Sequence, residues 1–171
     1  MKNQILTGIV IITLIIFGVA GCQRDDLCAE TDPTTPMLIL KFQDSEEPEE
    51  DKSVTNLRVL AEGIETPLSG LSASTTDSIS IPLRSFSSET TFILISDYEI
   101  DSEGIETGNM DTLRFDYTTK EVFISRACGF VANYETLTAN LTNDSDNWIQ
   151  TIIVNKDTIT DETQTHVTIL H

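Results

Sequence analysis

Short runs of alternating apolar and polar residues recur along the chain from about residue 36 to the C-terminus. Such alternation places successive side chains on opposite faces of a β-strand, so that one face can be buried. No run after residue 22 shows the 3.6-residue period of an amphipathic helix. The pattern predicts an all-β fold, an antiparallel β-sandwich (Ig-like or similar) of about nine strands. The expected strands cover residues 37–42, 57–59, 79–83, 91–95, 113–117, 122–125, 137–141, 149–154 and 167–169.

Turn-forming and polar residues predict the connections between these strands. Residues 63–76 are rich in Gly, Ser and Thr and predict a long loop. Thr118, Thr119 and Lys120 are expected to form the turn of a hairpin. The acidic stretch 97–111 is expected to be a loop between two strands, and residues 143–147 a polar turn.

The first 22 residues have the pattern of an export signal. Lys2 is followed by an apolar stretch, residues 5–20, that is shorter than the ~20 residues of a spanning helix. The sequence Val19-Ala20-Gly21-Cys22 resembles the lipobox of bacterial lipoproteins. That resemblance implies cleavage before Cys22, acylation of its thiol and attachment to a membrane through the lipid. The alternative is an ordinary signal peptide with a spare cysteine.

The four residues after Cys22 add an expectation about location. Gln23-Arg24-Asp25-Asp26 resembles the short acidic export signal of some Bacteroidota lipoproteins. The resemblance implies an outer-membrane, lipid-anchored protein, with exposure on the cell surface as the finer expectation. The alternative is a plain polar tether. We therefore expect a signal peptide over 1–21, a lipidated tether over 22–35 and a single β-sandwich domain over 36–171.

Cysteine parity predicts a disulfide. If Cys22 carries lipid, Cys28 and Cys128 remain as an even pair in an oxidising compartment. We expect them to be bonded to each other. Two free thiols or a metal-binding pair are the alternatives, and the absence of a CxxC spacing makes the metal pair the weaker of these.

The charge balance limits the partners. The chain has 28 acidic and 10 basic residues, a formal net charge of −18. Such a surface repels nucleic acid and anionic headgroups, so nucleic-acid binding is not expected. It suits a solvated exterior, or a partner that is basic or a cation.

No catalytic motif is present. The sequence contains no GxSxG, HExxH, phosphate-binding loop or dinucleotide-binding glycine pattern. His166 and His171 are the only imidazoles. We interpret His166 as a structural or exposed strand residue rather than a general base, and expect the terminal His171 to fray. The chain is therefore not expected to be an enzyme; a hydrolase built on His166 is the remaining alternative.

Two polar features are candidate ligand sites. Within the acidic stretch, Asp97, Asp101, Glu103 and Asp111 supply hard oxygens that Ca²⁺ prefers, although their spacing does not match an EF-hand. A solvated loop is the alternative, and no other cofactor is expected. Trp148 with Tyr134 could form a stacking platform for a glycan. The alternative is that Trp148 fills the core.

Three hydroxyls are candidate O-glycosylation sites. Ser78, Thr112 and Thr158 each lie in an Asp-Ser/Thr-apolar tripeptide, and these tripeptides resemble the acceptors used in exported Bacteroidota proteins. Each tripeptide precedes an expected strand. The alternative is that Asp-Ser/Thr simply begins strands well.

The order of several features along the mature chain resembles a family of uncharacterised small Bacteroidota lipoproteins. The features are Cys28, Pro36 with the strand after it, Leu83, Asp111-Thr112-Leu113 with Tyr117, the block 125–130 and the late His166. The family has no assigned activity, so the resemblance implies a location rather than a chemistry. We expect a non-enzymatic cell-envelope lipoprotein that docks onto another envelope protein. A small glycan- or Ca²⁺-binding module is the alternative.

Overall fold

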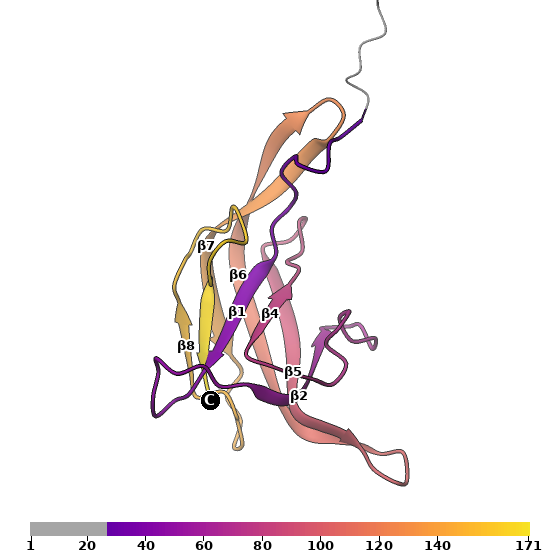
Figure 1. Ribbon diagram of the computed structural model, residues 1–171, viewed down its shortest axis with the longest axis vertical. Helices are drawn as coiled ribbons and strands as arrows, with labels where there is room; N and C mark the ends of the chain where they lie inside the picture. Colours follow the sequence, from indigo (N-terminus) through magenta and orange to yellow (C-terminus); the bar gives the residue numbers. More distant parts are fainter. Residues whose placement is uncertain (1–26) are drawn as a thin grey trace, which may run out of the picture. The chain divides into compact units, whose positions relative to one another are not determined.

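The computed structural model describes residues 27–171, and this part of the chain folds into nine strands in two sheets, with no helix (Figure 1). The predicted all-β, sandwich-like fold is confirmed. The strands are β1 (Leu38–Gln43), β2 (Val54–Ala61), β3 (Ser74–Thr76), β4 (Ser78–Ile81), β5 (Glu89–Ile100), β6 (Glu106–Ser125), β7 (Gly129–Leu141), β8 (Thr151–Val154) and β9 (Val167–Leu170).

Residues 34–122 and 131–171 form the larger of two compact units, and it contains the core. One sheet has the order β4-β1-β9-β8, and the other has the order β3-β2-β5-β6-β7. All pairings with a resolved register are antiparallel except that of β1 with β9, where Leu40 lies opposite Val167 in a parallel ladder. The sandwich is therefore mostly antiparallel, and the last strand enters its sheet beside the first in the same direction.

The core follows from the alternation seen in the sequence. Leu38, Leu40 and Phe42 of β1 are fully buried, as are Leu113 and Phe115 of β6. The intervening residues of β1 are half-buried and those of β6 are half-buried or exposed. Each fully buried Leu or Phe contributes roughly 1.5–3 kcal/mol relative to an exposed side chain. The two sheets thus share one hydrophobic core.

Strand β6 is longer than predicted. Thr118, Thr119 and Lys120 lie inside it rather than in a turn. The Lys120 ammonium lies 3.0 Å from a carboxylate oxygen of Glu135 on β7, and such cross-strand pairs support a continuous ladder. The hairpin turn between β6 and β7 is formed instead by residues 126–128.

The acidic stretch 97–111 is also largely strand, so the loop prediction for it is wrong. Strand β5 continues to Ile100 and β6 begins at Glu106, which leaves only residues 101–105 for the connection. Gly108 makes this close pairing possible. Its φ is +141°, and a Cβ there would lie 2.8 Å from the backbone oxygen of Ser96. The long loop predicted over 63–76 likewise contains the short strand β3.

Within the described residues, the smaller compact unit comprises 27–33 together with Phe123–Phe130, the turn of the β6–β7 hairpin and its flanks. The signal peptide and Cys22 lie outside the described residues. Within 27–171, no helix is long and apolar enough to cross a membrane.

Candidate functional site

Two tyrosine hydroxyls hold the loop between β4 and β5. The Tyr117 hydroxyl of β6 donates to the backbone oxygen of Arg84 at 2.8 Å. The Tyr134 hydroxyl of β7 donates to the backbone oxygen of Leu83 at 3.1 Å. The two rings pack edge to face with centroids 5.0 Å apart, and both are buried. Burial raises the pKa of Tyr117, so its hydroxyl stays protonated and able to donate at neutral pH.

Further hydrogen bonds fix the rest of this loop. The amide of Arg84 donates to the Thr90 hydroxyl at 3.0 Å. The Thr119 hydroxyl donates to the backbone oxygen of Ser87 at 3.2 Å, and the Tyr117 amide donates to that of Ser88 at 2.9 Å. Backbone groups at both ends of the loop are thus paired with β5 and β6, which is how a loop becomes ordered without a core of its own.

This ordered loop presents Phe86 to solvent. The Phe86 side chain is 96% exposed, more than any other large apolar residue among those described. Beside it lies an open groove of about 550 Å³ between the loop and β6. An aromatic ring held in water on a fixed loop is typical of a binding anchor, because burying it against a partner releases apolar surface with little loss of backbone freedom. We call residues 82–88 the Phe86 loop.

The groove itself is lined mainly by hydroxyls. Its lining residues are Ser85, Phe86, Ser87, Ser88, Tyr117, Thr118, Thr119 and Glu121. None of these is a His, Cys, Lys or Arg, and Glu121 is the one residue of the lining with an ionisable carboxylate. The arrangement offers hydroxyl groups, one carboxylate and the exposed ring of Phe86.

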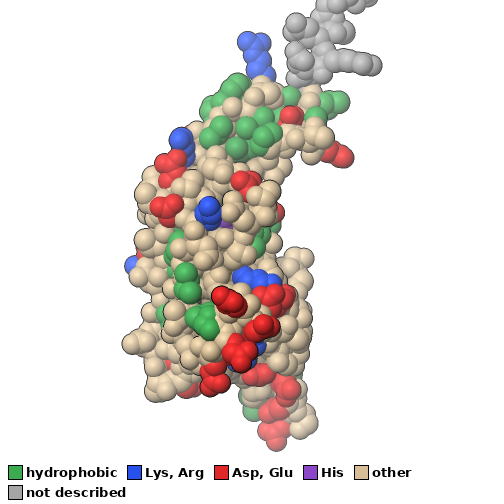
Figure 2. Space-filling view, turned by 60° about the vertical axis from the view of Figure 1, so that its left-hand side comes forward, with side chains coloured by type: hydrophobic (Ala, Val, Ile, Leu, Met, Phe, Trp, Pro, Cys, Tyr) green, Lys and Arg blue, Asp and Glu red, His purple; other side chains and the backbone are tan. Residues whose placement is uncertain are grey.

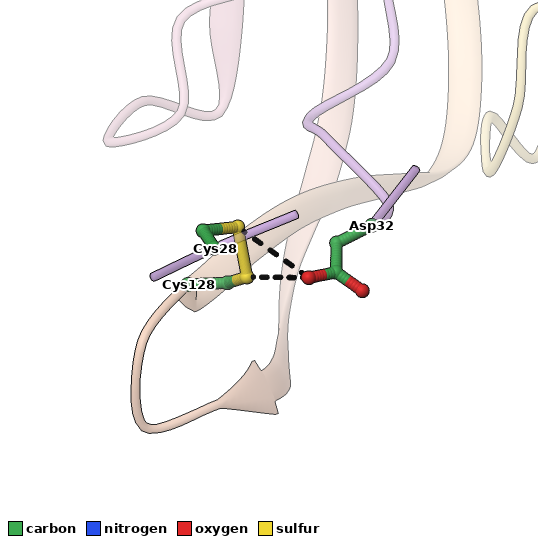
Figure 3. Close-up of side chains that lie close together, drawn as sticks. All are labelled: Cys28, Asp32 and Cys128. Atoms are coloured by element: carbon green, nitrogen blue, oxygen red, sulfur yellow. Dashed lines mark hydrogen bonds between the residues drawn. A yellow bond between two sulfur atoms is a disulfide. The ribbon is translucent and has the colours of Figure 1, made fainter. Parts of the chain in front are cut away.

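In the smaller unit, Cys28 and Cys128 form a disulfide with an S–S distance of 2.01 Å, as the sequence predicted. Figure 3 shows the Asp32 carboxylate beside this bond, with Oδ2 at 3.1 Å from the Cys128 sulfur and 3.7 Å from that of Cys28. Because bonded sulfurs carry no hydrogen, these are close approaches rather than hydrogen bonds. A neighbouring carboxylate disfavours a thiolate, whereas exchange-active cysteines sit in electropositive surroundings. The geometry therefore suits a structural disulfide.

The same three residues are the only group of three or more His, Cys, Asp or Glu side chains that converge closely enough for a metal ion within residues 27–171. Both sulfurs are consumed by the disulfide, and a metal would require thiolates. The alternative of a metal-binding cysteine pair is therefore contradicted.

The candidate Ca²⁺ ligands are not brought together, so that prediction is wrong. Asp111 is fully buried on β6 opposite Leu94, whereas Asp101 lies in the connection that follows β5. Asp101 is seven residue steps along the chain from Leu94, the partner of Asp111, which is roughly 20 Å at the usual rise per strand residue. Asp101 uses its Oδ1 to accept from the amides of Glu103 and Ile105, at 2.8 and 2.9 Å. Asp97 is exposed at a bulge of β5, with a φ of +50°.

Asp111 instead fastens the polar segment after β7. Its Oδ1 accepts from the Asn147 side-chain amide at 2.9 Å, and its Oδ2 accepts from the Ile149 amide at 2.8 Å. Burial raises the pKa of Asp111, while the hydrogen bonds from Asn147 and Ile149 act in the opposite direction. The residue serves the fold rather than a ligand.

The predicted glycan platform is also wrong. Tyr134 is fully buried, and its hydroxyl is used by the Phe86 loop. Trp148 is half-buried and packs against Phe42 of the core, with ring centroids 6.2 Å apart. It also packs against His171, with ring centroids 5.5 Å apart. The His171 amide donates to the Gln43 backbone oxygen at 3.1 Å, so the C-terminal residue is held and not frayed.

His166 is a structural residue, as interpreted from the sequence. Its ring is buried, and Nδ1 accepts the amide of Ile39 at 3.0 Å. Burial lowers the pKa of His166, so the ring is neutral and its remaining proton is on Nε2. The residue completes the ladder where β1 meets the start of β9, and this role excludes it as the base of a hydrolase.

The three candidate glycosylation hydroxyls have different surroundings. Ser78 begins β4, and its hydroxyl donates to the Leu40 backbone oxygen at 3.1 Å. Thr112 lies in the interior of β6, and Thr158 is exposed in the connection between β8 and β9. The expectation that each tripeptide precedes a strand is confirmed for Ser78, whereas Thr112 lies inside a strand and Thr158 in a connection.

Phe86 is the residue that the sequence reasoning missed. It stands as a lone aromatic among serines, outside every alternating run. This isolation indicates that Phe86 is not part of a buried strand face, because a core residue of a strand would have apolar neighbours two positions away.

Comparison with known proteins places most of the chain in one family. Residues 56–171 match a family of unknown function, DUF6452. No curated protein and no solved structure matches the chain. The matched region begins within β2 and includes the Phe86 loop, Tyr117, Tyr134 and Cys128, but not Cys28. Because the match covers more than half of the sequence, the chain belongs to the family of unknown function DUF6452.

Proposed function

We propose that this protein is a lipid-anchored component of the bacterial cell envelope whose β-domain binds another envelope protein through the Phe86 loop, without catalysis. The observation that carries the docking part is the Phe86 ring, 96% exposed on a loop whose backbone is fixed by Tyr117 and Tyr134. A preorganised aromatic anchor of this kind is typical of protein-binding surfaces.

The location is supported by two independent features. The lipobox-like sequence ending at Cys22 is the pattern of bacterial lipoproteins. The disulfide between Cys28 and Cys128 suits an oxidising compartment outside the cytosol. Together with the resemblance of residues 23–26 to a Bacteroidota export signal, these features favour an outer-membrane lipoprotein on the cell surface.

The chemistry of the groove favours binding over catalysis. Its lining combines hydroxyls, the ring of Phe86 and the single carboxylate of Glu121, and it holds no imidazole, thiol or amine. The net charge of −18 further disfavours nucleic acid as the partner. A protein with a complementary apolar pocket and hydrogen-bonding groups at its rim fits these properties best.

Site-specific photocrosslinking in cells tests the docking. A photoreactive amino acid placed at Ser85 or Ser87 should give one discrete adduct in envelope fractions. Phe86→Ser should abolish that adduct, because it removes the anchor without touching a core residue. Ile64→Ser is the matched control, since Ile64 is also an exposed apolar loop residue. The proposal fails if no adduct forms, or if the adduct survives Phe86→Ser.

The same groove supports glycan binding as a second candidate. Five of its eight lining residues are Ser or Thr, whose hydroxyls suit a sugar, and Phe86 could pack against an apolar sugar face. A glycan that raises the melting temperature of the wild-type protein but not that of Phe86→Ser would favour this candidate. Equal shifts in both proteins, or none in either, would exclude it.

A further inference from the structure

The turn of the β6–β7 hairpin carries an exposed aromatic pair. Phe123 and Phe130 flank the turn, are 56% and 64% exposed, and pack edge to face with ring centroids 5.2 Å apart. Leu27, in the same compact unit, is 87% exposed. Figure 2 shows hydrophobic side chains gathered over this turn, near the top of the view. We call Leu27, Phe123 and Phe130 the tip patch.

The charge around the tip patch differs from that of the rest of the chain. Residues 122–134 contain a single charged residue, Arg126, although the chain has 28 acidic and 10 basic residues. This is the longest stretch without an acid after residue 26. Arg126 is exposed in the turn itself. The same compact unit also holds Glu30 and Asp32, and the Asp32 carboxylate lies 3.1 Å from the Cys128 sulfur. The hairpin turn itself carries one base and no acid, so anionic headgroups meet less repulsion there than along the rest of this acidic chain.

The disulfide ties this turn to the segment that follows Cys22. Cys128 lies in the turn and is bonded to Cys28, and Leu27 is the preceding residue. Only six residue steps separate Cys22 from Cys28. Even a fully extended chain of that length spans at most about 20 Å. Lipid on Cys22 would therefore hold Cys28, and with it the turn to which Cys28 is bonded, within about 20 Å of the point where the acyl chains enter the bilayer.

We propose that the tip patch is a membrane-contact site. In this arrangement Phe123, Phe130 and Leu27 enter the interfacial region of the bilayer that holds the lipid of Cys22, and Arg126 pairs with lipid phosphate. The inference rests on the lipid anchor of the proposed function. Aromatic rings with a flanking base are typical of segments that lie in the headgroup region. The occupant is a lipid surface rather than a protein, because the tether brings the bilayer within reach of the patch.

Depth-dependent fluorescence quenching tests the proposal. The mature protein, purified from envelopes with its acyl chains, is reconstituted into phosphatidylethanolamine–phosphatidylglycerol vesicles with or without bromine on the lipid chains. Phe130→Trp should show a blue-shifted emission maximum and a loss of emission on the brominated vesicles. Phe86→Trp is the matched control and should show neither. The native Trp148 is common to both proteins, so their difference reports the introduced ring.

The other outcomes either exclude membrane contact by the tip patch or show that the lipid anchor at Cys22 has failed while the patch can still be tested. Emission from Phe130→Trp that is unquenched, or as weakly quenched as in the control, excludes membrane contact. A blue shift without quenching that grows with protein concentration assigns the patch to a second copy of the chain. Mass spectrometry of the same preparation shows whether Cys22 is acylated. If it is not, the anchor fails, and the patch is tested on the same chain coupled through Cys22 to a maleimide lipid, with the same quenching expected.

Discussion

Acidification should destabilise the domain through His166. The neutral ring accepts the amide of Ile39 at Nδ1, and a proton at that nitrogen would remove the acceptor and place a charge in the core. Burial lowers the pKa of His166 below its ordinary value of 6.5. The unfolded chain therefore binds more protons than the folded one at mildly acidic pH. The stability contributed by neutral His166 is complete above pH ~6.5 and is lost as pH falls toward its folded-state pKa.

The size of the effect follows from one proton. Between pH ~6.5 and the folded-state pKa of His166, the free energy of unfolding should fall by at most ~1.4 kcal/mol per pH unit. His166→Gln should lose this slope, because the glutamine oxygen can accept from Ile39 without titrating. His166→Ala should cost roughly 2–4 kcal/mol at neutral pH, since it leaves the Ile39 amide without an acceptor and opens a cavity.

Urea unfolding of the mature chain at several values between pH 7.5 and 5.5 measures this directly. Asp44 and Asp51, whose pKa values are lowered, and Asp111, whose pKa is raised by burial, are common to wild type and His166→Gln, so their titration cancels in the comparison. The pKa of Asp161 is also lowered, by hydrogen bonds to its carboxylate and in part by His166, so this carboxylate stays ionised at the pH values compared. Parallel pH profiles for the two proteins would refute the role assigned to the ring.

Three further substitutions probe other parts of the fold. Replacing both Cys28 and Cys128 with serine removes a cross-link between residues 100 apart and should lower the free energy of unfolding by up to ~4.7 kcal/mol in urea titrations. No change would mean that the disulfide does not restrain the unfolded chain as assumed. Asp111→Ala should lower the free energy of unfolding by roughly 2–4 kcal/mol, because it leaves a buried amide unpaired, whereas Asp101→Ala in the β5–β6 connection should lower it far less. Equal losses would contradict the structural role assigned to Asp111. Gly108→Ala should lower the melting temperature by several degrees, since its Cβ would lie 2.8 Å from the backbone oxygen of Ser96. An unchanged melting temperature would show that the backbone of β5 can shift to accommodate the Cβ without loss of stability.

The strand content and the buried faces could be predicted because alternation is a local property. Leu38, Leu40 and Phe42 were recognisable as one core face from their spacing alone. The parallel pairing of β1 with β9 was not, since it joins segments more than 100 residues apart that carry no mutual signal. Lys120 was read as part of a turn because it is polar, although its partner Glu135 lies on the next strand.

The sites were predictable to different degrees for similar reasons. The disulfide could be predicted from the even number of remaining cysteines and the export signal, because both are visible in the sequence without knowledge of the fold. The proposed Ca²⁺ site failed because composition does not show that Asp111 faces the core while Asp101 lies in a connection. The Phe86 loop was missed because its order depends on hydroxyls of Tyr117 and Tyr134, which are remote in the sequence.

Intact-mass spectrometry of the protein purified from cell envelopes, without reduction, tests the central claim of lipid anchoring most directly. The account predicts a chain that begins at Cys22, carries the added mass of acyl groups on that residue, and contains the Cys28–Cys128 disulfide. A chain that begins elsewhere, or an unmodified Cys22, would contradict it.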